Sequence, residues 1–308
     1  EVFPSVGASF RIAQATARSG IKNFLLGSGP ATYQYEYARH HDAALNNTLF
    51  WNVQFTQGFN AILTHIVSWG IFGTAAFLLF LGIGLHRVFR LWKGARADYM
   101  ASAVGALFAY AATTLFFYPQ NFVMYFLVFA FAGMLTAFAT EGRGGYGTIS
   151  FSIPIVMMLA AVCTGGLIYI NGRRYVAAIQ FGRGVRVASE TKDMSKALPL
   201  LMAGSSLDPQ NDAYWAIIAS AYLAHANTIA SASAGTPDDA VRKNITDAVS
   251  SAVSATERAT QINPVSAANW IALAQVYAAV APQDSDSASS IFAVYGKAAS
   301  LDPANPAI

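Results

Sequence analysis

Charged residues are scarce in this chain: Lys, Arg, Asp and Glu make up 11% of its 308 residues, where a soluble domain usually carries about 25%. The net charge of +3 is small and spread among loops, so nucleic acid is not an implied partner. Between Asp42 and Arg87 there is no Lys, Arg, Asp or Glu. The composition excludes an ordinary soluble globular protein and indicates a membrane protein.

Cysteine is almost absent. The single Cys163 can form no disulfide within the chain, and its place inside an apolar segment favours a buried, small hydrophobic side chain. No group of Cys and His suggests zinc, and no group of Asp and Glu suggests magnesium or calcium. The sequence therefore predicts no metal and no cofactor.

Four apolar segments are each long enough to cross a bilayer, whose core of about 30 Å needs about 20 apolar residues in a helix. They are Ile62–Leu85, Met100–Phe117, Phe122–Ala139 and Ile149–Ile170. The two middle segments are short and are expected to form a tight helical hairpin. The sequence predicts a transmembrane region of four helices over residues 60–171 and a linking helix over residues 172–192.

Basic residues next to the apolar segments set the predicted topology. Four Lys and Arg residues lie between Arg87 and Arg96, and positively charged flanks favour the cytoplasm. Residues 1–59 are then an extracytoplasmic loop region, and everything after Ile170 is also outside. Four arginines between Arg173 and Arg186 argue against this orientation, because they place basic charge on the opposite side.

The last third of the chain repeats a pattern. Leu207-Asp208-Pro209 precedes Trp215-x2-Ile218-Ala219-x2-Tyr222, Ile262-Asn263-Pro264 precedes Trp270-x2-Leu273-Ala274-x2-Tyr277, and Leu301-Asp302-Pro303 opens a third unit. The pattern resembles the tetratricopeptide repeat, which has W-x2-L-G-x2-Y in its first helix and a Pro at the boundary of a unit of about 34 residues. The resemblance predicts a helical solenoid over residues 193–308.

The predicted repeat units are longer than usual, with the excess in the polar loops Ser231–Asp239 and Pro282–Ser287. A helical pair cannot bury its apolar face alone, so the repeats are expected to lean on Tyr175–Lys192 or on further units. A groove for a protein or peptide is the functional interpretation. The alternative is that the repeated Trp and Tyr residues only pack the core.

A basic stripe marks the N-terminal loop region. Phe10–Leu25 is predicted to form one amphipathic helix capped by Ser9. At about 100° per residue, Arg11, Arg18 and Lys22 lie within roughly 40° of one another on it. Guanidinium and ammonium groups suit a pyrophosphate. The alternative is a surface helix whose long side chains reach lipid headgroups.

A series of short motifs runs through residues 5–90. Ser9-x-Arg11 precedes Phe24-Leu25-Leu26-Gly27-Ser28-Gly29-Pro30-x-x-Tyr33, and an aromatic-rich stretch leads to Phe59-Asn60-x-x-Leu63 and Trp69-Gly70-Ile71-Phe72-Gly73. This order resembles the closing part of the O-antigen ligase/polymerase family, of which members fused to tetratricopeptide repeats are known. The resemblance implies a multi-pass glycosyltransferase. Such an enzyme takes glycan from a polyprenyl pyrophosphate carrier at the outer face of the cytoplasmic membrane.

The important departure from the family pattern is Phe59, which stands where the family places the His of its H-N pair. A phenylalanine can neither contact carrier phosphate nor assist an acceptor hydroxyl. The resemblance carries Arg11 over as the substrate-binding basic residue, with Arg18 and Lys22 as supports. It carries Asn60 over as the partner of the missing His.

Three other histidines are candidates for proton transfer near neutral pH. His65 lies six residues after Phe59, near the predicted membrane entrance, and its alternative is a neutral side chain hydrogen-bonded between helices. His40 and His41 lie on the aromatic loop and could approach the site from above. Their alternative is a solvated loop.

The sequence thus predicts an all-α protein of the cytoplasmic (inner) membrane, with a multi-pass transmembrane helix bundle followed by a tetratricopeptide-repeat solenoid. The expected function is glycosyl transfer from polyprenyl-pyrophosphate-linked glycan. Membrane lipid and a protein or peptide held by the repeats are the other expected partners. The alternative, favoured by Phe59, is a non-catalytic membrane-anchored scaffold for envelope protein assembly.

Overall fold

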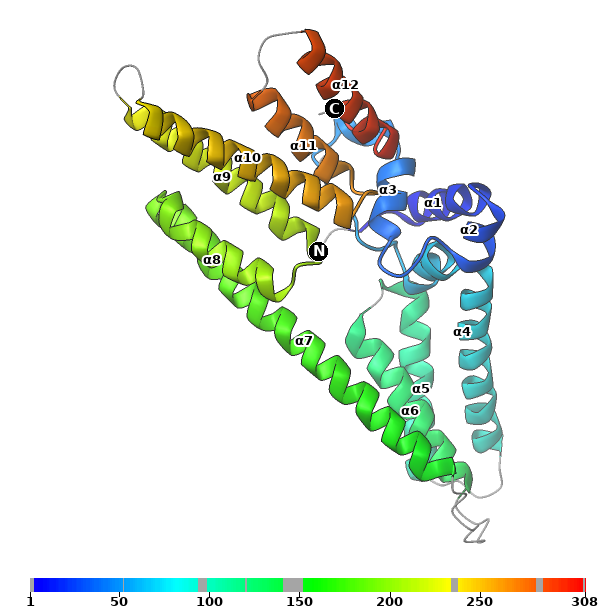
Figure 1. Cartoon of the computed structure of the whole chain (residues 1–308). Coiled ribbons are helices and arrows are strands. Elements are labelled where there is room, and N and C mark those ends of the chain that lie inside the picture. Colours follow the sequence, from blue (N-terminus) through cyan, green and yellow to red (C-terminus); the bar gives the residue numbers. More distant parts are fainter. Residues whose placement is uncertain are drawn as a thin grey trace. The chain divides into compact units, whose positions relative to one another are not determined.

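The computed structural model describes residues 3–308 except 52, 94–98, 120, 141–151, 234–237, 281–284 and 307. Over these residues the chain forms twelve α-helices and one short 3-10 helix, and no strand (Figure 1). The all-α prediction is confirmed. The chain divides into two compact units, one of Glu1–Tyr146 with Asp302–Ala307 and one of Gly147–Leu301 with Ile308.

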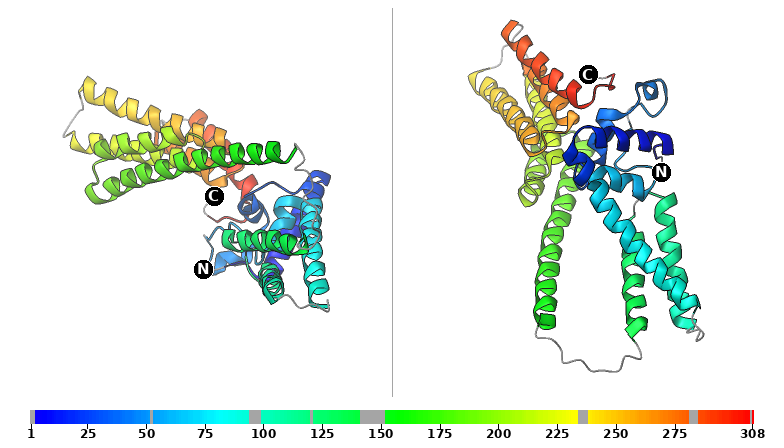
Figure 2. Two further views of the ribbon diagram at one scale, coloured as in Figure 1. Left: turned by 90° about the horizontal axis from the view of Figure 1, so that it is seen from below. Right: turned by 90° about the vertical axis from the view of Figure 1, so that its right-hand side faces the viewer.

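The first unit combines a bundle of three long helices with a cap of short ones. Its elements are α1 (Val6–Arg18), α2 (Ile21–Leu26), α3 (Tyr33–His40), η1 (Ala43–Asn47), α4 (Ala61–Lys93), α5 (Tyr99–Phe117) and α6 (Phe122–Thr140). Helices α4, α5 and α6 lie side by side, with α1–α3 gathered at one end of them (Figures 1 and 2). Their core includes Leu81, Phe108 and Leu135, one from each helix.

The four predicted membrane spans are confirmed only in part. Over the described residues, α4 and α5 are long and apolar enough to cross a membrane, and Phe122–Phe138 is a shorter apolar helix. Helices α5 and α6 pack on each other, as expected of the middle segments. The first three residues of the predicted segment Ile149–Ile170 lie outside the described residues, and the rest belongs to a longer helix.

The prediction of one helix over Phe10–Leu25, capped by Ser9, is wrong. Helix α1 begins at Val6, where the Ser5 hydroxyl accepts a hydrogen bond from the Ala8 amide. It ends at Arg18, because the Ser19 hydroxyl donates back to the Thr16 carbonyl at 2.7 Å and competes with the helical pattern. Lys22 therefore lies on a different helix from Arg11 and Arg18.

Two glycines interlock the loop after α2 with a break in α4. Gly27 and Gly70 both have positive φ, at 76° and 65°, and Gly70 interrupts the helical backbone of α4. A Cβ on Gly70 would lie 2.5 Å from the amide nitrogen of Gly27. Only glycine allows two backbones to approach so closely in this conformation.

The carbonyl groups released by the break in α4 are satisfied by the loop. The amide of Ser28 donates to the Val67 carbonyl at 2.9 Å, and the amide of Gly29 donates to the Ser68 carbonyl at 3.0 Å. Irregular backbone in an apolar setting is tolerated where protein groups pair with it in this way. The Gly27–Pro30 turn and the segment around Gly70 therefore pack and hydrogen-bond as one local structure.

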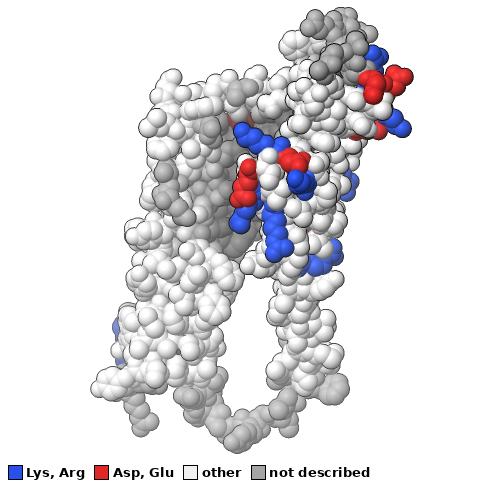
Figure 3. All heavy atoms as spheres, turned by 90° about the vertical axis from the view of Figure 1, so that its left-hand side faces the viewer, with Lys and Arg blue, Asp and Glu red and all other residues white. Residues whose placement is uncertain are grey.

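The second unit begins with one long helix and continues with shorter pairs. Its elements are α7 (Ser152–Thr191), α8 (Met194–Leu207), α9 (Asp212–Ala232), α10 (Asp239–Ile262), α11 (Ala267–Val280) and α12 (Ser285–Leu301). Residues of the predicted fourth span and of the predicted linking helix belong to α7 without interruption. Figure 3 shows the first half of α7 without charged side chains and the basic ones beyond it. The prediction that Cys163 is buried is wrong, because Cys163 is exposed on the first half of α7.

The repeated motifs make the same local contact twice. The indole of Trp215 donates to the Pro209 carbonyl at 3.1 Å, and that of Trp270 donates to the Pro264 carbonyl at 2.9 Å. The three boundary motifs begin at Leu207, Ile262 and Leu301, the last residues of α8, α10 and α12. These repeats form the helical hairpins α9–α10 and α11–α12.

The structure adds a hairpin before the two that the sequence predicts. Its helices are the second half of α7 and α8, in which Phe181 packs on Gly204 and Leu201 packs on Gly184. The ring of Phe181 also stacks on Tyr214 of α9, with centroids 4.0 Å apart. The expected support of the repeats by Tyr175–Lys192 is thus provided by a helix that acts as a member of the stack.

Candidate functional site

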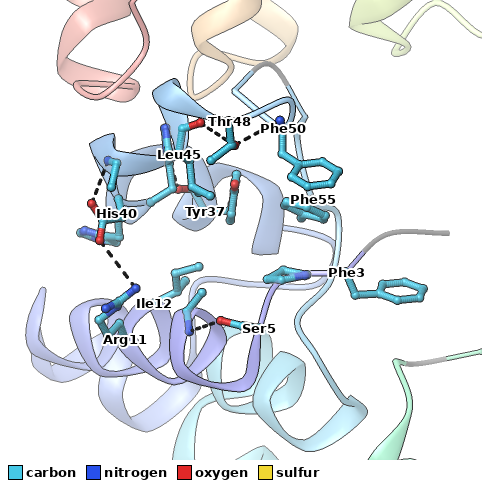
Figure 4. A pocket seen from close by; sticks show the side chains of 15 residues that line it. Phe3, Ser5, Arg11, Ile12, Tyr37, His40, Leu45, Thr48, Phe50 and Phe55 are labelled. Atoms are coloured by element: carbon cyan, nitrogen blue, oxygen red, sulfur yellow. Dashed lines mark hydrogen bonds and ion pairs between the residues drawn. The ribbon is translucent and has the colours of Figure 1, made fainter.

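A cavity of about 440 Å³ lies in the cap of the first unit, between α1, α3 and η1. Figure 4 shows Arg11 of α1 and His40 of α3 at one end of it, and Phe50 and Phe55 at the other. Ile12 and Tyr37 lie between these ends. Pockets for small ligands are commonly of this size, mainly apolar, with a few polar groups that fix orientation.

Arg11 is the predicted basic residue that reaches the cavity. Its guanidinium Nη2 lies 3.7 Å from Oδ2 of Asp42, and both side chains are more than half exposed. Such an exposed pair contributes about 0–1 kcal/mol, so an anionic ligand can displace the carboxylate at little cost. Asp42 also accepts a hydrogen bond from the Ala44 amide at 2.9 Å, which fixes it at the start of η1.

His40 connects the cavity to a buried carboxylate that the sequence did not indicate. Its Nε2 lies 3.6 Å from Oε2 of Glu36, which is 4% exposed. Burial raises the pKa of Glu36, but the hydrogen bond with His40 and the charge of Arg39 outweigh it, so the pKa lies below its usual value. A carboxylate that contacts an imidazole orients the ring.

His41 lines the same cavity but is held differently. Its Nδ1 lies 3.2 Å from the Tyr37 carbonyl and 3.0 Å from the Ala38 carbonyl, and its ring stacks on Tyr37. Since carbonyl oxygens only accept, Nδ1 must carry a proton. Asp302 of the same unit lies 3.7 Å from that nitrogen. His41 is therefore fixed by the backbone.

His65, the third candidate, does not line this cavity. It is 1% exposed on α4, its Nε2 lies 2.6 Å from the Tyr125 hydroxyl of α6, and its ring stacks on Trp69. This is the arrangement expected of a histidine that ties two helices together.

Asn60 has a structural task at the start of α4. Its side-chain oxygen accepts a hydrogen bond from the Leu63 amide at 2.8 Å, and its side-chain nitrogen donates to the Phe116 carbonyl at 2.7 Å. The first bond caps α4 and the second ties it to the end of α5. Both functional groups of Asn60 are thus occupied within the protein.

Phe59 is held in place by Ser9, the residue that was expected to cap a helix. Its amide donates to the hydroxyl of Ser9 at 2.9 Å, and Ser9 is fully buried. Arg18 and Lys22 are exposed, and neither lines the cavity. The structure therefore brings together Arg11, His40 and His41, and leaves the other candidates elsewhere.

Among the site residues, Glu36 and Asp42 were missed. The only sequence signal is their spacing, since Glu36 stands four residues before His40 and Asp42 follows the two histidines. Over the described residues no group of three or more His, Cys, Asp or Glu side chains could hold a metal ion.

The chain matches no protein-family model and no curated protein sequence. The resemblance to the O-antigen ligase/polymerase family rests on the motifs alone.

Proposed function

We propose that this protein transfers glycan from a polyprenyl-pyrophosphate carrier at the outer face of the cytoplasmic membrane, as the motif resemblance implies. The observation that carries the proposal is the polarity of the cavity. One end presents Arg11 and His40, and the other presents phenylalanines. A cavity of this kind suits an amphipathic ligand with an anionic group at one end.

The proposed membrane location rests on exposed apolar surface. Large apolar side chains are exposed along the first half of α7, namely Ile155, Met157, Met158, Leu159, Val162, Leu167 and Ile168. They surround the helix rather than one face of it, which is typical of a helix in lipid. With α4, α5 and α6 they support a multi-pass protein, whose stacked hairpins we assign to the tetratricopeptide-repeat class.

In the proposed reaction the acceptor hydroxyl oxygen forms a bond to the anomeric carbon of the glycan. The bond from that carbon to the carrier pyrophosphate breaks, and the acceptor proton moves to His40. Arg11 neutralises the charge that grows on the leaving pyrophosphate, which is the larger contribution in such reactions. Glu36, buried behind His40, stabilises the imidazolium that forms.

The test uses the full-length protein in lipid with a radiolabelled polyprenyl-pyrophosphate oligosaccharide. Arg11→Ala is expected to slow carrier release by about 100-fold or more. Arg18→Ala, which removes another exposed arginine of the same helix outside the cavity, is the matched control and should release carrier at the wild-type rate. Equal loss in both variants would contradict the assignment of Arg11.

The base is tested by a second pair of variants. His40→Ala should lower kcat by about 100-fold and leave KM nearly unchanged, because the base acts on the acceptor in the transition state. Glu36→Gln keeps the shape of the carboxyl group and should lower kcat by less. If His41→Ala loses kcat and His40→Ala does not, the base is His41.

Phe59 favours a second candidate function, a non-catalytic scaffold. Its amide is held by the buried Ser9, so the backbone of the motif remains ordered although the family His is replaced. The scaffold would use its stacked hairpins to hold a protein or peptide. Wild-type protein that releases no carrier with any acceptor would favour this function.

A further inference from the structure

Helix α2 presents apolar side chains that the described residues of its unit leave exposed. Ile21 is 80% exposed, Leu26 is 61% exposed and Phe24 is 49% exposed, and the helix has no buried residue. A helix of six residues is marginally stable in water, and exposed apolar side chains gathered on it indicate an apolar environment outside the protein.

The glycine interlock fixes α2 beside the first third of α4. Gly27, the residue after α2, meets Gly70, which lies nine residues beyond Ala61 at the start of α4. Figure 1 shows the straight part of α4 running on from the level of α2. The apolar surface of α2 is therefore at the height where that straight part begins.

The surroundings of α4 change at the same point. Before Gly70 the helix is largely packed in protein, with Thr64, His65 and Val67 buried. After Gly70 the exposed residues of α4 include several large apolar ones, among them Ile71, Phe72, Leu79 and Ile83. The twenty-one residues from Gly70 to Arg90 rise about 30 Å in a helix, which equals the thickness of a bilayer core. Their first charged side chain is Arg87, near the far end.

Basic charge accompanies the apolar surface of α2. Arg18 precedes the helix, Lys22 lies in it, and both are exposed. Apolar side chains combined with Lys and Arg are the composition of elements that lie in the interface of an anionic bilayer. The phosphates of anionic lipid headgroups complement these two charges.

We propose that α2 lies in the headgroup layer of the bilayer and that the membrane path of α4 begins at Gly70 rather than at Ala61. Ile21, Phe24 and Leu26 enter the acyl boundary, while Arg18 and Lys22 contact anionic lipid phosphate. Ala61–Trp69 then belongs to the cap above the bilayer. The proposal is independent of glycosyl transfer, since it would hold equally for a scaffold.

The single cysteine of the chain makes the proposal directly testable. In a full-length Cys163→Ser protein, one cysteine is introduced at a time at Ile21, Phe24 or Leu49 and carries a nitroxide spin label. Leu49 is the matched control, because it is an apolar residue of the same unit that is 94% exposed but lies in the loop after η1. The protein is placed in vesicles of phosphatidylcholine with a minor fraction of phosphatidylglycerol.

Labels at Ile21 and Phe24 should collide more with oxygen, which concentrates in lipid, than with a water-soluble nickel complex. The label at Leu49 should show the opposite preference. A water-like signal at Ile21 and Phe24 would overturn the interfacial placement of α2. In vesicles without phosphatidylglycerol, or in an Arg18→Gln, Lys22→Gln background, the labels should move toward water. No movement in either case would overturn the role given to the two basic residues.

A second label series tests where α4 enters the membrane. Labels at Phe72 and Leu79 should show the lipid signal, and labels at Leu63 and Ile66 should not. A lipid signal that already runs through Leu63 and Ile66 would place the start of the span at Ala61 and refute the boundary at Gly70.

Discussion

The contacts that stabilise each compact unit internally differ in kind between the two units. In the second unit one short-range bond recurs, from Trp215 to Pro209 and from Trp270 to Pro264, and the hairpins share a common pattern. The first unit contains instead one close approach of two backbones, at Gly27 and Gly70. The second unit thus repeats one contact in similar hairpins, whereas the contact at the two glycines of the first unit occurs at one place.

The largest effect is expected at that single point. Gly70→Ala forces a methyl group against the Gly27 amide at a position with positive φ, and it should destabilise the first unit by on the order of 3 kcal/mol or more. Gly82→Ala is the control in the same helix, because a Cβ there meets nothing within 4 Å. Denaturant unfolding in detergent, followed by circular dichroism, compares the two. Equal unfolding midpoints for the two variants would mean that the contact between Gly27 and Gly70 accommodates a methyl group without loss of stability.

High pH should weaken the cap of the first unit through Tyr37. Burial, followed by the charges of Tyr33 and Asp302, raises the pKa of Tyr37 from 10.0 to about 12. The folded state thus favours the neutral phenol. Its contribution is complete below pH 10, where the unfolded chain is also neutral, and is lost as the pH rises to about 12.

The loss between pH 10 and pH 12 is expected to be on the order of 2 kcal/mol. Unfolding free energies of wild type and Tyr37→Phe, measured across this range, test it. The variant should lose less stability than wild type. Parallel curves would show that Tyr37 ionises as easily folded as unfolded.

Smaller and equal effects are expected in the second unit. Trp215→Phe and Trp270→Phe each remove one indole hydrogen bond and should each cost about 1 kcal/mol. Trp51→Phe, in an exposed loop of the first unit, should cost much less. Thermal unfolding of the full chain compares the three. A large inequality between the two repeat variants would argue against equivalent hairpins.

The smallest effect is expected at the start of α8. Asp193 accepts hydrogen bonds from the Ser195 hydroxyl and amide and pairs with Lys196, which lowers its pKa from 3.8 to about 2. Its contribution is present above pH 4 and is lost as the pH falls toward 2. The protection of the Ser195 amide against hydrogen exchange, relative to its intrinsic rate at each pH, should fall over that range in wild type. In Asp193→Asn the exchange should depend on pH only through its intrinsic chemistry.

The features predicted from the sequence are the periodic ones. Apolar runs and the Pro-to-Trp spacing indicated α4, α5, α9 and α11, because helix formation and hairpin packing follow local patterns. The break between α1 and α2 was missed, since Ser19 and Gly20 interrupt a helical pattern only weakly. The hairpin of α7 and α8 was missed because residues 152–207 contain no tryptophan and so lack the Pro-to-Trp motif.

For the site, the sequence indicated Arg11, His40 and His41 but not how they are arranged. The pairing of Glu36 with His40 depends on a buried turn of α3, and the pairing of Arg11 with Asp42 depends on where η1 begins. The first distance follows from the spacing of four residues only once residues 33–40 are known to be helical, and the second does not follow from spacing at all. The Gly27–Gly70 contact likewise joins two motifs whose interaction required the folded backbone.

The continuity of α7 sets the rotational phase of the second unit. Since each residue turns a helix by about 100°, the exposed apolar residues of the first half of α7 and the Phe181 face that supports α8 hold a fixed angular relation. One residue inserted near Asn171 would rotate the repeats by about 100° about the helix axis, whereas seven inserted residues would nearly restore their orientation. The number of residues in α7 between its first half and Phe181 therefore determines the direction in which the hairpins point.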